Sequence, residues 1–318
     1  MKGEFKLLLL LAASAALLSQ CKKEADIDPD DIVNFADPLF LNRLISEGVD
    51  LNGDGIITLD EAEAADTINV SGEGISDIGG IEAFTNLLAL NCKGNNLIHM
   101  DLSGNLRLKF LDCEGNPLGD LDISRNVALE ELFCGNCELS TLDVSNNPEL
   151  NYLYCHGNRL SSLEVSNLIQ LQVLDCNYNQ LATLDVSGCL ALSFLDCGSN
   201  SLGTLTVSNN PELSRVDCMS NLLTHLDVSN APSLMWLDCA WNQLISLDVS
   251  NDLNLWTLNL LDNKLSTLDV SSCTSLKHLQ IWGNPDLYKV CVWIMPFPPE
   301  GVYVNSEGSP NVYFDTCD

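Results

Sequence analysis

Basic residues are scarce in this chain: 14 lysines and arginines stand against 44 aspartates and glutamates, which gives a net charge of −30. Surfaces that bind nucleic acid or anionic lipid need clustered positive charge, so this balance argues against both partners. Histidine is also rare, with four residues in the chain, and none of them stands beside a marked nucleophile. We therefore predict a protein that is not an enzyme.

Cysteine, by contrast, is abundant, and eight cysteines recur 21 residues apart from Cys92 to Cys239. The same position is occupied by Leu260 and Ile281 in the two units that follow. A constant period over this many units predicts a stack of repeats. Each unit reads L-x-x-L-x-C-x-x-N-x-L-x-x-L-D-V-S-x-N-x-x. Its alternating apolar positions predict a short strand with one face inward, followed by a second extended segment on the opposite wall.

The first eleven positions of the unit match the pattern L-x-x-L-x-L-x-x-N/C-x-L. The chain thus resembles bacterial leucine-rich repeat proteins of the 21-residue subclass. This resemblance implies an α/β-type solenoid, mostly β, that forms a right-handed arc with a parallel sheet over residues 66–288. It also implies a binding function. The asparagine column from Asn95 to Asn284, with Cys137 in one place, is interpreted as bonding backbone groups at the turns; a polar binding ladder is the alternative.

The ladder cysteines replace core leucines, so we expect free, buried thiols that act as small hydrophobic groups. Cys134 and Cys137 form a C-x-x-C pair. Redox motifs of this kind work at a helix N-terminus, whereas this pair lies in a repeat strand and turn. We therefore do not expect a redox function for this pair. Cys291 and Cys317 bracket the last part of the chain, residues 289–318. We predict a disulfide between them that closes a C-terminal cap.

The first 20 residues have the pattern of an export signal, with a positive start and an apolar stretch over residues 7–18. The stretch ends in L-S-Q-C, which resembles a bacterial lipobox and implies lipid attachment at Cys21. Gln20 departs from the small residue usual there, so cleavage after Ala15 stays open. The acidic tether, residues 21–36, resembles those of Bacteroidetes-type lipoproteins. We expect an outer-membrane or cell-surface lipoprotein, with membrane contact only through its anchor; a periplasmic or secreted protein is the alternative.

Residues 50–61 read D-L-N-G-D-G-I-I-T-L-D-E and fit the EF-hand calcium loop. Calcium is a hard cation that prefers oxygen ligands. The predicted ligands are Asp50, Asn52, Asp54, Ile56 through its carbonyl, Thr58 and Glu61. We expect one structural Ca²⁺ in a helix–loop–helix over residues 37–65, with a helix from Pro38 to Val49 and a short one from Glu61. The alternative is a loop that keeps its turn without the metal.

The columns beside the inward leucine and cysteine must face outward along the sheet. One column has an aromatic residue in alternate repeats, and the next is mostly acidic. We expect these columns to bind an extracellular protein or a glycan. The alternatives are rings that only cover the sheet, and a purely structural spacer lipoprotein of the envelope. The candidate ligand face comprises Phe110, Tyr152, Tyr154, Phe194, Trp236, Asp175, Asp196, Asp217 and Asp238.

Overall fold

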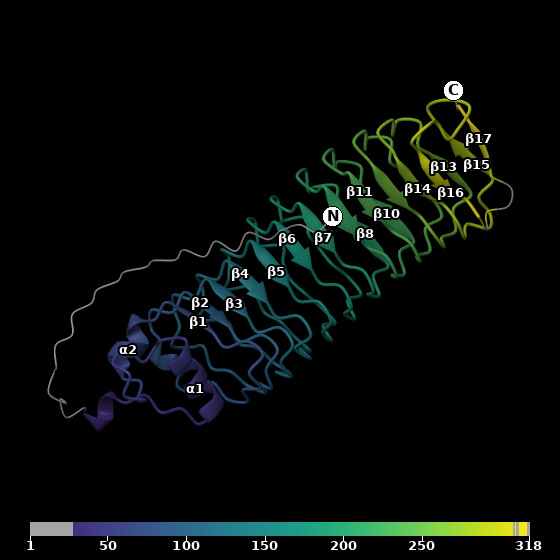
Figure 1. The fold of residues 1–318 in the computed structure, drawn as a ribbon. Helices are drawn as coiled ribbons and strands as arrows, with labels where there is room; N and C mark the ends of the chain where they lie inside the picture. Colours follow the sequence, from purple (N-terminus) through teal and green to yellow (C-terminus); the bar gives the residue numbers. More distant parts are fainter. Residues whose placement is uncertain (1–27, 308, 310–311, 317–318) are drawn as a thin grey trace.

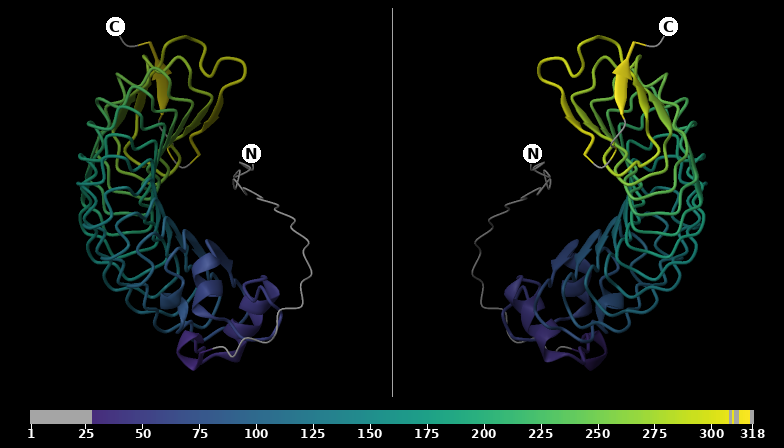
Figure 2. Two further views of the ribbon diagram at one scale, coloured as in Figure 1. Left: turned by 90° about the vertical axis from the view of Figure 1, so that its left-hand side faces the viewer. Right: turned by 90° about the vertical axis from the view of Figure 1, so that its right-hand side faces the viewer.

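The protein is a curved solenoid with a small helical cap at its N-terminal end (Figures 1 and 2). The computed structural model describes residues 28–307, 309 and 312–316. The predicted export signal, Cys21 and Cys317 therefore lie outside the described residues. No helix in the described part of the chain combines the length and apolar character needed to cross a membrane.

A parallel sheet of 12 strands runs along the inner side of the arc (Figure 2). Successive strands pair in register one repeat apart, as Leu153 does with Leu174. This pairing confirms the predicted parallel sheet. The strands are β1 (Thr67–Asn69), β2 (Ala89–Asn91), β3 (Phe110–Asp112), β4 (Glu131–Phe133), β5 (Tyr152–Tyr154), β6 (Val173–Asp175), β7 (Phe194–Asp196), β9 (Arg215–Asp217), β11 (Trp236–Asp238), β12 (Thr257–Asn259), β14 (His278–Gln280) and β16 (Tyr303–Asn305).

The second half of each repeat forms the opposite wall, as the sequence predicts. In five places it pairs into strands, in one sheet of two strands and one of three. Elsewhere it runs extended without a regular ladder. These strands are β8 (Thr204–Thr206), β10 (His225–Asp227), β13 (Thr267–Asp269), β15 (Lys289–Cys291) and β17 (Tyr313–Asp315). Beyond β2, the described part of the chain contains no helix.

The core lies between the two walls and continues from repeat to repeat. From β1 to β14, the central apolar residue of each strand in the 12-stranded sheet is buried, and so is each ladder cysteine, as in Leu237 and Cys239. All eight ladder cysteines, together with Cys137, Cys189 and Cys273, are free and buried. Burial raises the pKa of the Cys134 and Cys176 thiols well above the usual range. The ladder therefore acts as apolar packing, as predicted.

Two columns of asparagine hold the turns. In the predicted column, the Asn158 amide donates to the carbonyls of Cys134 and Cys155, each at 2.9 Å. Its Oδ1 accepts from the N–H of Leu139 at 3.0 Å. The structural interpretation of this column is confirmed. A second column, which the sequence analysis did not interpret, ends the L-D-V-S-x-N segment and comprises Asn105, Asn126, Asn147 and Asn210, each bonded to carbonyls of the preceding repeat.

Much of the acidic charge has a local structural role. The aspartate of the L-D-V-S sequence accepts a hydrogen bond from the serine N–H two residues later, at 2.9 Å for Asp143 with Ser145 and for Asp185 with Ser187. Hydrogen bonds from the serine hydroxyl and N–H lower the pKa of both carboxyl groups. These exposed aspartates fix turns of the outer wall.

The N-terminal cap contains η1 (Pro29–Asp31), α1 (Pro38–Ser46), α2 (Leu59–Ala64) and, in the first repeat, η2 (Ile81–Ala83). The predicted helix to Val49 is too long, because α1 ends at Ser46 and Gly48 adopts a φ of +86°. The second helix begins before Glu61, because the side chain of Thr58 caps α2. Phe40 and Leu44 of α1 are fully buried and close the open end of the core.

Both ends of the described chain join this architecture. Val33 donates from its N–H to the carbonyl of Ile57 at 2.9 Å, so residues 28–36 of the predicted tether reach the cap. At the other end, β15 and β16 continue the two walls past residue 288. Cys291 is disulfide-bonded. Its pairing with Cys317 stays a prediction.

Candidate functional site

The predicted ligand residues lie on the concave side of the 12-stranded sheet, which faces away from the core. We call this solvent-facing surface the inner face. Phe110, Tyr152, Phe194 and Trp236 occupy the first positions of β3, β5, β7 and β11, and one strand separates each from the next. The third positions of neighbouring strands form the second column. Three of the four rings are half-buried, while Trp236 is 36% exposed. The two columns therefore lie side by side on one outward face.

The rings near the N-terminal half contact one another both along the second column and across the two columns. Phe133 and Tyr154 are stacked, with ring centroids 4.7 Å apart and an interplanar angle of 7°. Phe110 packs against Phe133 at 5.5 Å. Cross-strand aromatic contacts of this kind stabilise a sheet. They also cover ring faces that a flat ligand would otherwise reach.

The cationic side chain of Arg215, for which no role was predicted, lies between two of the predicted aromatics. The guanidinium of Arg215 sits 5.5 Å from the ring centroid of Phe194 and 4.8 Å from that of Trp236. Both distances fall within the range of cation–π interactions. The sequence hinted at this contact, because Arg215 is the one arginine in the column that contains Phe194 and Trp236.

The acidic column forms a continuous row on β6, β7, β9 and β11. Burial, together with the nearby charge of Asp196, raises the pKa of Asp175 and of Asp217 to about 6. Oδ1 of Asp217 accepts a turn-forming hydrogen bond from the N–H of Met219 at 3.2 Å. No hydrogen bond reaches its Oδ2 from the described residues. Asp238 continues the row. The inner face therefore concentrates carboxylates, and a bound cation would reduce the repulsion between them.

His156 lies at the junction of the aromatic and acidic parts. Its Nδ1 is 3.5 Å from Oδ2 of Asp175, and its Nε2 is 3.9 Å from Oε1 of Glu114. His156 and Asp175 come from adjacent repeats, and the solenoid brings their side chains together. No serine, threonine or cysteine hydrogen bond to His156 is present among the described residues, so this group does not form a nucleophile–base pair.

The predicted calcium loop curls around its first carboxylate. Asp50 accepts hydrogen bonds from the N–H groups of Gly53 at 2.7 Å and Gly55 at 2.9 Å. Gly55 has a φ of +83°, the left-handed conformation that the sharp turn requires. Asn52 and Asp54 each accept from the N–H two residues later at 2.8 Å. Asp50, Asn52 and Asp54 are therefore held by the backbone of one short loop.

The last predicted ligand closes the loop. Glu61 accepts from the N–H groups of Leu51 and Thr58, each at 3.0 Å, with different carboxylate oxygens. It also forms a capping box with Thr58 at the start of α2. The donors are all oxygens, which suits a hard cation. Within residues 28–307, 309 and 312–316, no group of three His, Cys, Asp or Glu side chains is arranged as a metal centre, so calcium binding stays a prediction.

Known structures share this architecture. The chain is similar to the functional domain of InlJ from Listeria monocytogenes, which includes a cysteine ladder, at 34% identity and a TM-score of 0.76. That match covers 81% of this chain and 56% of that domain, so the chain spans little more than half of it. The fold is that of a leucine-rich repeat protein. The free, buried cysteines of this leucine-rich repeat protein form such a ladder.

Two further structures bear on the fold alone. An internalin of Listeria monocytogenes, InlF, matches at 21% identity over 88% of this chain and 95% of its own, with a TM-score of 0.65. A leucine-rich repeat protein of Leptospira interrogans matches at 23% identity over 65% and 63%, with a TM-score of 0.56. No protein-family model and no curated protein sequence matches the chain.

Proposed function

We propose that this leucine-rich repeat protein is a non-enzymatic extracellular binding protein whose inner face recognises a protein partner with basic side chains. The observation that carries the proposal is the acidic row on β6, β7, β9 and β11. Its carboxyl groups are half-buried beside one another, so lysine or arginine side chains of a partner would relieve their mutual repulsion. Aromatic residues beside the row supply the apolar contact that anchors an interface.

A glycan is the second candidate for the inner face, and the ring geometry favours it less. Sugar rings stack on open aromatic faces. Here Phe133 and Tyr154 cover each other, and Arg215 covers faces of Phe194 and Trp236. These contacts take up one face of each of the four rings. Such a surface suits a protein partner better than a sugar.

The test is affinity capture of extracellular proteins with the wild-type protein and with the double variant Asp175→Asn and Asp217→Asn. A partner recovered with the wild type should bind the double variant at least about tenfold more weakly, because two charge-assisted contacts are lost. Asp143→Asn and Asp185→Asn on the outer wall form the matched control and should bind normally. Equal affinity of all three proteins for the partner would refute the inner-face assignment.

The alternative is a structural spacer of the envelope. If capture at low salt yields no partner whose recovery depends on the inner face, the spacer function is favoured over the binding function. The turn chemistry of the outer-wall aspartates shows that acidic residues here also serve the fold. A spacer would therefore tolerate the inner-face substitutions without loss of function in the cell.

We further propose one structural Ca²⁺ in the loop of residues 50–61. The support is the oxygen-only donor set and the backbone bonds that hold Asp50 and Glu61 at the loop. Glu61→Gln keeps a side chain able to complete the capping box, but removes a carboxylate charge, so it should weaken calcium binding while α2 persists. Calorimetry measures the affinity, with the exposed Glu63→Gln as control. No heat with millimolar Ca²⁺ would reject the site.

The predicted export and lipid anchor complete the proposal. The L-S-Q-C sequence at residues 18–21 supports lipid attachment at Cys21 and a position at the cell surface or outer membrane. Mass spectrometry of the mature N-terminus distinguishes a lipid-modified Cys21 from a free N-terminus at Ala16. The second result would leave a secreted or periplasmic protein.

A further inference from the structure

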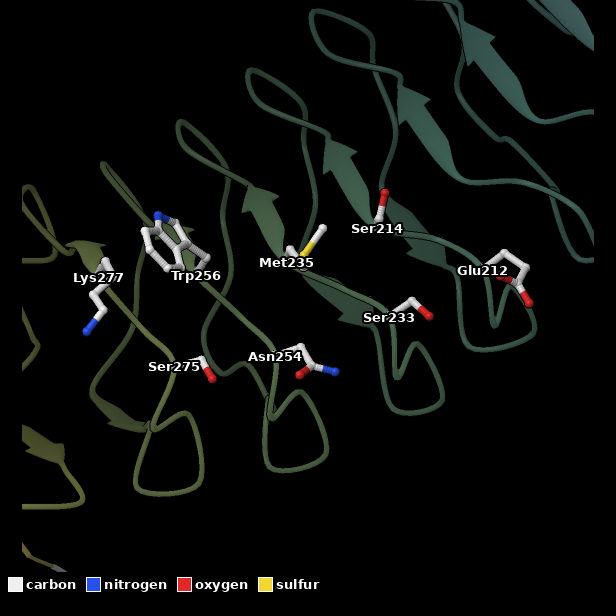
Figure 3. A pocket seen from close by; sticks show the side chains of 8 residues that line it. All are labelled: Glu212, Ser214, Ser233, Met235, Asn254, Trp256, Ser275 and Lys277. Carbon is white, nitrogen blue, oxygen red and sulfur yellow. The ribbon is translucent and has the colours of Figure 1, made fainter. Parts of the chain in front are cut away.

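An open groove lies on one flank of the solenoid, outside the inner face (Figure 3). Its volume is about 680 Å³, within the range of small-ligand sites. Two rows of side chains line it. The first row lies on the turns before the strands, and the second consists of the residues that directly precede β9, β11, β12 and β14. The lining residues are Glu212, Ser233, Asn254 and Ser275 in the first row and Ser214, Met235, Trp256 and Lys277 in the second.

The groove has an open aromatic platform, unlike the inner face. Trp256 is 51% exposed and lies between Met235 and Lys277 (Figure 3). No ring contact or cation–π contact involves Trp256 in the part of the chain that the structure describes. The half-exposed indole can therefore contact a ligand with C–H groups, as a pyranose ring has.

The two ends of the groove carry opposite charges. Glu212 stands at one end and Lys277 at the other, separated by three repeats, or about 14 Å at the spacing of parallel strands. Among residues 28–307, 309 and 312–316, neither side chain forms an ion pair or a side-chain hydrogen bond. An unpaired lysine is notable in a chain with a net charge of −30. The end at Lys277 can thus accept a carboxylate, while Glu212 can accept hydrogen bonds from hydroxyl groups.

Between the charged ends, hydroxyl and amide groups line the groove together with the apolar Met235 and Trp256. Ser214 uses its hydroxyl hydrogen in a bond of 3.0 Å to the carbonyl of Ser193, which leaves its lone pairs as acceptors. Asn254 donates to the carbonyl of Pro232 at 3.0 Å and keeps its Oδ1 for a ligand. Ser233 and Ser275 can donate and accept. This lining matches a ligand that is rich in hydroxyl groups.

We propose that this groove binds a linear oligosaccharide of about four sugar units that carries a carboxylate near one end. Four repeats each contribute one polar side chain at the equivalent position of the first row, one repeat for each sugar unit. The repeat spacing of about 4.8 Å is close to the length of one pyranose unit. An extended peptide advances about 3.3 Å per residue, so its groups would fall out of step with the rows.

The backbone beside the groove also disfavours a peptide. Strands β9, β11 and β12 are each paired on both sides, and β14 pairs with β12 and β16. No free strand edge is available there to add a peptide strand. Recognition must come from side chains, as it does for sugars. The site is independent of the protein-binding face proposed above.

The experiment uses two probes that differ in one charge. Xylotetraose is neutral, and a xylotriose that carries one glucuronic acid is its acidic counterpart. The wild-type protein should bind both, the acidic probe more tightly, as measured by calorimetry and tryptophan fluorescence. Lys277→Ala should remove the preference for the acidic probe, a change of about threefold for a solvent-exposed ion pair. Trp256→Ala should weaken both probes by about tenfold, because the stacking platform is lost.

Matched variants keep the result interpretable. Trp241→Ala removes an exposed tryptophan at a different position of the repeat, and Lys109→Ala removes a lysine from the same column as Lys277 but outside the groove. Both should bind the probes like the wild type. Absence of binding at millimolar probe, or equal binding by Trp256→Ala, overturns the proposal. If the groove variants instead change only the affinity for a protein partner, the groove belongs to the protein interface and the proposal is wrong.

Discussion

Asp252 occupies the second asparagine column, where the other polar side chains donate hydrogen bonds to carbonyls of the preceding repeat. Within the described chain, the Asp252 side chain makes no such bond. Asn210 donates to the carbonyls of the residues 24 and 21 positions earlier, Val186 and Cys189, at 2.9 Å each. Cys273 donates its thiol to the equivalent carbonyl of Val249. An ionised carboxylate has no hydrogen to donate. Asp252 is 1% exposed, and neither of its side-chain oxygens has a hydrogen-bond partner within the described residues.

Burial raises the pKa of Asp252 to about 7 from its ordinary value of 3.8, and the charge of Asp248 adds to the effect. The unfolded chain loses this proton near pH 4, whereas the folded chain keeps it to about pH 7. Stability is therefore lost as pH rises between these values, by about 1.4 kcal/mol per pH unit, and stays low above them. The full difference is about 4 kcal/mol, and relaxation of the turn reduces it to about 2–4 kcal/mol.

We predict that Asp252→Asn stabilises the protein at neutral pH, because the new amide can donate to the carbonyls of Val228 and Ala231. Urea unfolding should show a gain of about 2–4 kcal/mol at pH 7.5 that shrinks toward zero near pH 4. The reverse substitution, Asn210→Asp, is the control and should destabilise with the opposite pH dependence. A gain that does not change with pH, or a loss of stability at pH 7.5, would refute the argument.

Three other predictions follow from burial and charge. Leu237→Ala should lower the free energy of unfolding in urea by about 2–5 kcal/mol, whereas Trp236→Ala on the inner face should lower it far less. Similar losses for the two variants would contradict the inside–outside assignment. Alkylation should label few ladder thiols in the native protein and all eight after denaturation without reductant. Ladder cysteines that still resist alkylation after denaturation would mean that the ladder is cross-linked. Binding of a basic partner should strengthen as pH rises through about 6, where Asp175 and Asp217 ionise, and a flat pH profile in a binding titration would exclude these groups from the interface.

The N-terminal cap shows how far local sequence reasoning reaches. The loop of residues 50–61 and its two flanking helices were predictable, because glycines and oxygen-bearing side chains stand at fixed offsets. The helix ends were not, because Gly48 and the Thr58 cap decide them. That Val33 pairs with Ile57 was also hidden, since it joins segments with no shared pattern.

The repeat pattern alone predicts the repeat stack, the strand register and the inside–outside alternation. A period of 21 residues aligns equivalent positions, so burial of one leucine fixes the orientation of every neighbour. The same alignment of repeats places Asp252 at a position that is asparagine in several other repeats. Three features could be read only from the folded molecule: the curvature of the arc, the place of Arg215 between two rings and the groove at Trp256. These features depend on how side chains of adjacent repeats pack across the small rotation between them, and a one-dimensional period does not encode that packing.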